Sequence, residues 1–140
     1  MSIVTSRILI PIGFSDQSII ALGQGFNLAK IKKSEIILLS VIENQNMIES
    51  LFLDDKTHEL QQKVNNKLVE VGKKYATEYD IHVETMVAKG RVYEKIIEVA
   101  EMVNADLIVM GTNGNDSFKD YILGSTATNV SNHAKCPVLI

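Results

Sequence analysis

Asp106-Leu-Ile-Val-Met-Gly111-Thr-Asn-Gly114 is the stretch that decides the fold, because a short apolar run passes directly into a pair of glycines. A continuous apolar run of this kind predicts a strand that is covered on both faces. Gly111 lets the backbone turn sharply where the strand ends, and Gly114 repeats that freedom one turn later. After nine intervening residues, Gly124-Ser125-Thr126 opens a predicted helix over 125–134. The unit is therefore a strand, a glycine loop and a helix.

Outward from this unit, strands and helices alternate along the whole chain. Apolar runs predict further strands over 7–12, 35–42, 81–87 and 137–140. Apolar residues at steps of three and four predict helices over 15–32, 60–79 and 92–103, with 43–55 as a loop or a frayed helical extension. Without a repeat or a linker, we expect one domain over 1–140. Right-handed crossovers then give a doubly wound α/β domain, a five-stranded parallel sheet with helices on both faces.

Composition excludes several classes of function. The 14 Lys and Arg against 17 Asp and Glu give a net charge of −3, and no basic stripe is present, which argues against nucleic-acid binding. No apolar run approaches the roughly 18 residues that cross a bilayer. The first residues do not follow the pattern of a signal peptide, so we expect a cytoplasmic protein with no membrane partner.

Catalytic and metal-binding patterns are also missing from the sequence. Cys136 is the only cysteine, and we expect it to be a small buried residue that packs near the last strand. His58, His82 and His133 are scattered, so we predict no metal site. No serine lies in a nucleophile elbow, and we assign no catalytic residue.

The glycine loop is the candidate site. Doubly wound sheets bind ligands beyond the carboxyl ends of their strands, where the strand order reverses. The N-terminus of a helix opening at Gly124 would offer backbone N–H groups and a positive dipole to an anion, and Ser125 and Thr126 would add hydroxyls. The alternative is that the glycines only shape a turn and Ser125 only caps a helix. The spacing fits neither the dinucleotide nor the Walker motif, which disfavours a Walker-type hydrolase.

The pattern Gly-x2-Gly-x9-Gly-Ser resembles the nucleotide-binding motif of the universal stress protein family, whose fold is adenine nucleotide alpha hydrolase-like. Segments 8–18, 38–41, 89–90, 105–111 and 136–139 resemble the family in register, so the likeness covers essentially the whole chain. It implies that ATP or AMP binds across the ends of the first, second and fourth strands, with the Val41 backbone holding adenine. The implied contacts are Pro11, Ile12, Gly13, Val41, Met110, Gly111, Gly114, Gly124, Ser125 and Thr126.

Two positions depart from the family pattern. Gly13 stands where the family usually carries an Asp, and losing that charge-assisted hydrogen bond costs about 1.5–3 kcal/mol, roughly tenfold to hundredfold in affinity. Asn115-Asp116 replaces a basic residue that often follows the second glycine, which leaves Lys119 as the nearby cation. The added Asp and the single Lys predict a site that takes fewer phosphates or needs a divalent ion such as Mg²⁺.

The resemblance predicts a regulatory stress-response protein that binds an adenine nucleotide. Two alternatives remain open, namely a nucleotide-free interaction module of the same fold and a slow ATPase, although no general base is identifiable for the latter. The apolar strand from Pro137 to Ile140 would lie at a sheet edge, where strands readily pair with another chain. We therefore expect a homodimer through this strand, with half of a tandem protein as the alternative.

Overall fold

The computed structural model describes residues 6–13, 16–43, 54–111 and 124–140. The strands are β1 (Arg7–Pro11), β2 (Glu35–Ile42), β3 (Val83–Lys89), β4 (Leu107–Val109) and β5 (Val138–Leu139). The helices are α1 (Asp16–Lys32), α3 (Asp54–Tyr79), α4 (Val92–Met102) and α5 (Ser125–His133).

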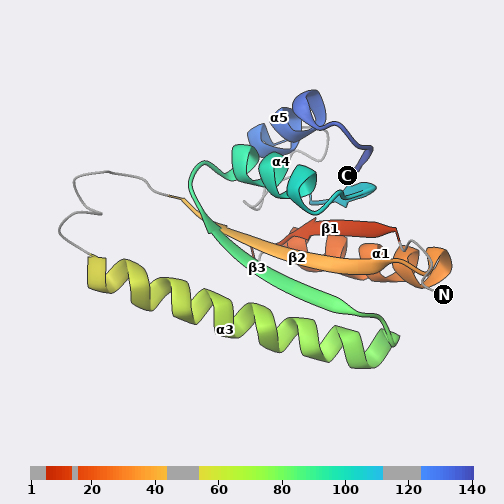
Figure 1. The fold of residues 1–140 in the computed structure, drawn as a ribbon, viewed down its shortest axis with the longest axis horizontal. Helices are drawn as coiled ribbons and strands as arrows, with labels where there is room; N and C mark the ends of the chain where they lie inside the picture. The colour runs from red at the N-terminus through yellow and green to blue at the C-terminus, as the bar shows by residue number, and fades with distance from the viewer. Residues whose placement is uncertain (1–5, 14–15, 44–53, 112–123) are drawn as a thin grey trace.

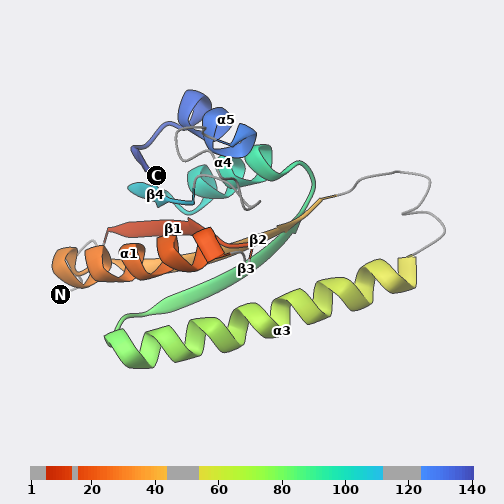
Figure 2. The same ribbon diagram turned by 180° about the vertical axis from the view of Figure 1, so that it is seen from behind.

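The strands form one parallel sheet in the order β3-β2-β1-β4-β5. Helices α1 and α3 lie on one face of this sheet, and α4 and α5 lie on the other (Figure 1 and, from behind, Figure 2). The predicted doubly wound, five-stranded α/β fold is confirmed. Because the chain runs from β1 to β2 and β3 on one side and then to β4 on the other side of β1, the strand order reverses between β1 and β4.

Strand β2 lies between β3 and β1 in the interior of the sheet, and burial of both its faces explains its continuous apolar run. Ile36 and Leu38 pack in the core under α1 and α3, whereas Ile37 and Leu39 pack in the core under α4 and α5. All four side chains are 0 or 1% exposed. Complete burial of such a side chain contributes about 1.5–3 kcal/mol, so a polar residue at either kind of position would weaken one of the two cores.

The predicted strand over 81–87 begins and ends two residues too early, because β3 runs from Val83 to Lys89. Helix α3 ends at Tyr79, and Asp80 then adopts a left-handed backbone with φ of 55°. The ladder with β2 runs from the pair Ile36 and Val83 to the pair Ile42 and Lys89, so the partner strand sets the limits of β3. Of the predicted loop or frayed helical extension over 43–55, residues 44–53 lie outside the described part. Residues 54 and 55 belong to α3, which begins six residues before the predicted helix over 60–79.

Cys136 is less enclosed than expected. It packs against the core under α4 and α5 but remains partly exposed. Burial of its thiol is the main cause that raises its pKa, so the neutral, weakly reactive form is favoured at neutral pH.

None of the helices in the described ranges combines the length and the apolar character needed to cross a membrane.

Candidate functional site

A pocket of about 350 Å³ opens at the carboxyl ends of β1 and β4. It lies at the reversal of strand order, which is the position where doubly wound sheets hold their ligands. Six elements contribute to its wall, namely the ends of β1, β2 and β4, the starts of α1 and α5, and one turn of α4.

The structure brings the predicted site residues together. Every predicted residue that the structure describes lines this pocket, and the set is Pro11, Ile12, Gly13, Val41, Met110, Gly111, Gly124, Ser125 and Thr126. Gly114 lies outside the described residues, as do Asn115, Asp116 and Lys119. That these residues contact a nucleotide remains a prediction.

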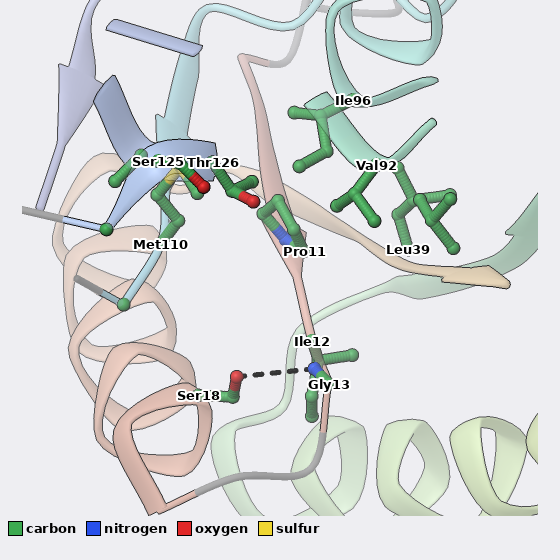
Figure 3. A pocket seen from close by; sticks show the side chains of 14 residues that line it. Pro11, Ile12, Gly13, Ser18, Leu39, Val92, Ile96, Met110, Ser125 and Thr126 are labelled. Carbon is green, nitrogen blue, oxygen red and sulfur yellow. Dashed lines mark hydrogen bonds between the residues drawn. The ribbon is translucent and has the colours of Figure 1, made fainter. Parts of the chain in front are cut away.

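The first turn of α5 supplies the anion-binding side of the pocket. Gly124 is the N-cap and makes no side-chain capping hydrogen bond, while its carbonyl accepts the N–H of Thr128 at 3.0 Å. Because glycine has no side chain, nothing at position 124 covers the first N–H groups of the helix on the pocket side. These groups and the positive end of the helix dipole favour an anion at this position. The hydroxyls of Ser125 and Thr126 lie on the same side in Figure 3.

An apolar wall stands opposite this helix start. Leu39, Val92 and Ile96 gather on the other side of Pro11 in Figure 3, and Val41 adds to the apolar lining. A surface of this kind suits the face of a flat aromatic ring, because ring faces lose little by leaving water. The pocket thus combines an apolar side and an anion-binding side.

The chain after β1 is fixed between β2 and α1. The N–H of Ile12 donates to the carbonyl of Leu39 at 2.8 Å, which holds the backbone against β2. The N–H of Gly13 donates to Ser18 Oγ at 3.2 Å, shown as the dashed line in Figure 3. A Cβ atom added to Gly13 would meet only Ser18 Oγ at 3.9 Å, which is an ordinary contact. The backbone here is therefore held in place, yet it has room for a side chain.

None of the described lining residues carries an ionisable side chain. No group in this lining can therefore act as a general base, and no lining carboxylate is available to hold a divalent metal. Elsewhere, the described residues contain no group of three or more His, Cys, Asp and Glu placed to hold a metal ion. The described lining is suited to bind a ligand that has an apolar face and an anionic end.

Sequence reasoning missed five lining residues, namely Ser18, Leu39, Val92, Ile96 and Ala127. Val92 and Ile96 were recognisable as one face of an amphipathic helix, which predicts burial. Their place beside the glycine loop depends on where α4 crosses the sheet. Ser18 lies only five residues after Gly13, and this closeness in sequence is the signal that could have placed it at the pocket.

The fold and the pocket together define a class, the doubly wound α/β proteins with a ligand pocket at the switch point and a glycine-bounded helix start. Within this class, the model of the universal stress protein family matches residues 5–140. The chain therefore belongs to the universal stress protein family.

Individual relatives agree with this membership. Universal stress protein MJ0577 from Methanocaldococcus jannaschii is 31% identical over 156 residues, covering 100% of this chain and 96% of the relative. A solved structure of MJ0577 superposes with a TM-score of 0.84 at 29% identity, covering 98% of this chain and 95% of that one.

Two more distant solved structures are complexes with a nucleotide. One is a universal stress protein from Archaeoglobus fulgidus with dAMP, with a TM-score of 0.66 at 16% identity, covering 99% of this chain and 98% of that one. The other is a universal stress protein with cAMP, with a TM-score of 0.65 at 21% identity, covering 96% of this chain and 95% of that one. At these identities the likeness concerns the fold.

Proposed function

We propose that this protein binds an adenine nucleotide in the pocket between β1 and β4 and serves a regulatory role in the stress response in the cytoplasm. The observation that carries the proposal is the convergence of three separate strand ends and the uncapped start of α5 on one pocket. The dAMP and cAMP complexes of proteins with the same fold support an adenine nucleotide as the ligand class. Binding without hydrolysis fits a described lining that contains no general base.

In this proposal, each side of the pocket holds a different part of the nucleotide. The adenine ring lies against the apolar wall, with Val41 beside its edge, and the ribose lies near Ile12 and Gly13. The phosphate lies at Gly111 and at the start of α5, where Gly124 leaves space and Ser125 and Thr126 donate hydrogen bonds.

The neutral lining favours ligands with few phosphates. A monophosphate brings a charge that one helix start with two hydroxyls can compensate, whereas a triphosphate brings about two more charges. The sequence of the loop that follows Gly111 adds Asp116 and Asp120 against Lys119. We therefore propose AMP as the preferred ligand in metal-free buffer, with Mg²⁺ needed to offset the charge of ATP.

Freshly purified protein tests the proposal. Mass spectrometry of the small molecules released on denaturation identifies any adenine nucleotide that co-purifies. Isothermal titration calorimetry with AMP then measures the affinity of stripped protein. Absence of a released nucleotide together with absence of heat at millimolar AMP would reject nucleotide binding.

Gly13 favours one second candidate, a nucleotide-free interaction module of the same fold. Without a side chain at this position, the pocket has no carboxylate in its described lining to hold the nucleoside end. In this case the protein would act only through its surface contacts, and its oligomeric state would not respond to AMP.

The edge strand β5 supports a homodimer in either case. Strand β5 lies at one end of the sheet order, and Leu139 and Ile140 are 44% and 38% exposed. We propose that two copies pair through Pro137 to Ile140, which would cover these side chains. Analytical ultracentrifugation should find a dimer, and Leu139→Lys should shift it to monomer. A wild-type monomer at tens of micromolar, or a dimer unaffected by this change, would reject the interface.

A further inference from the structure

Ser40 is a buried hydroxyl at the carboxyl end of β2, one residue before Val41. Its side chain is 4% exposed and does not line the pocket. Alternation along β2 places Ser40 on the same face as Ile36 and Leu38, under α1 and α3, whereas Leu39 and Val41 face the pocket side. A polar group buried in this place requires a structural reason.

The Ser40 hydroxyl bonds to the carbonyl of Ile12, the residue that directly follows β1. Ser40 Oγ donates to the carbonyl of Ile12 at 2.8 Å. Ile12 is already tied to β2 through its own N–H, which donates to the Leu39 carbonyl at 2.8 Å. The pairing of β1 with β2 ends at Pro11 and Leu39.

A regular parallel ladder would make a different bond at this point. Residues two apart on a strand direct their N–H groups to the same neighbouring strand, so the N–H of Val41 faces β1 as that of Leu39 does. The next ladder bond would join the Val41 N–H to the Ile12 carbonyl. Among the described residues this bond is not formed, and the Ser40 hydroxyl bonds to that carbonyl instead.

We infer that Ser40 is a positioning residue for ligand recognition. By bonding to the Ile12 carbonyl from the face opposite the pocket, its hydroxyl replaces the ladder bond and keeps the Val41 N–H directed toward the ligand. It also fixes the Ile12 backbone, which lines the pocket. The inference rests on the proposed function for its consequence in binding, whereas its structural part concerns the backbone alone.

Ser40→Ala removes the hydroxyl without adding bulk. The Ile12 carbonyl then recruits the Val41 N–H, and AMP loses the donor that meets the edge of its base. We expect AMP binding to weaken about tenfold, while binding of ribose 5-phosphate, which has no base, changes by less than about twofold. Ser40→Thr keeps the hydroxyl and should restore AMP binding. Both affinities are measured by calorimetry or NMR titration.

Ser34 offers a matched control at the other end of the same strand. It is 5% exposed, its hydroxyl bonds to the Ser6 hydroxyl, and it lies outside the pocket lining. Ser34→Ala should lower the midpoint of thermal unfolding as Ser40→Ala does, yet leave AMP affinity unchanged. Equal losses of AMP affinity in the two variants would mean that Ser40 acts only through stability and would overturn the inference.

Amide hydrogen exchange tests Ser40 without any ligand. In the wild type, the Val41 N–H should exchange faster than the Leu39 N–H, which lies within the ladder, and Ser40→Ala should slow the exchange at Val41. Equal protection of Val41 in wild type and variant would overturn the inference. Failure of wild-type protein to bind AMP would instead reject the proposed function, and the exchange result would still decide the role of Ser40.

Discussion

In the proposed binding mode, the two sides of the pocket differ in how they recognise AMP. The phosphate side uses backbone, because the start of α5 presents N–H groups that Gly124 leaves uncapped and uncovered. The nucleoside side has an apolar wall and a fixed backbone, but Gly13 gives it no charged side chain. The proposed site therefore depends on main-chain groups for the phosphate and has fewer side-chain groups for the nucleoside. A substitution that blocks the phosphate side should therefore abolish AMP binding. A substitution that adds a charged side chain to the nucleoside side should strengthen it.

Gly124→Val gives the largest expected effect. Its branched side chain occupies the space beside the first turn of α5, so it blocks the phosphate from the N–H groups. We expect AMP affinity to fall by more than about a hundredfold in calorimetry. Gly23→Val is the control, because a side chain at Gly23 on α1 meets nothing within 4 Å. Retention of AMP binding in Gly124→Val would show that the phosphate lies elsewhere.

Gly13→Asp should strengthen binding about tenfold to hundredfold, because a carboxylate beside the ribose restores a charge-assisted hydrogen bond. The structure accommodates the change, since the new Cβ lies 3.9 Å from Ser18 Oγ. Gly13→Asn is the matched variant, with nearly the same shape and no charge, and should gain less. An affinity of Gly13→Asp equal to that of the wild type would contradict the role assigned to this position.

Metal dependence gives the smallest expected effect. In metal-free buffer, AMP should bind a few-fold more tightly than ATP, because the described lining offers no cation to the additional phosphates. Addition of Mg²⁺ should strengthen ATP binding and leave AMP binding nearly unchanged. Calorimetric titrations with and without a chelator measure both. Tighter binding of ATP than of AMP without metal would contradict the account of charge in the pocket.

Sequence predicted the centre of the sheet better than its rim. Strand β2 was predicted over its observed residues, 35–42, because a central strand buried on both faces must be apolar throughout. For the edge strand β3, the predicted bounds are two residues too early. Its sequence alternates only in part, and its limits follow from pairing with β2. The local sequence thus predicted the bounds of a strand that is buried on both faces. It did not predict the bounds of an edge strand, because pairing with the neighbouring strand sets them.

The pocket shows the same division. Glycine spacing and the family resemblance identified the residues at Gly111 and at the start of α5. The apolar wall from Val92 and Ile96 was not identified, because its place depends on the path of α4 over the sheet. Ser40 also required the structure, since a single serine in an apolar run does not indicate which carbonyl it meets.

An NMR titration of ¹⁵N-labelled protein with AMP tests nucleotide binding on both sides of the pocket at once. We predict saturable shifts at the amides of Gly124, Ser125 and Thr126 and, with the same dissociation constant, at those of Ile12, Gly13 and Val41. Absence of shifts at millimolar AMP, or shifts confined to residues outside this pocket, would contradict it.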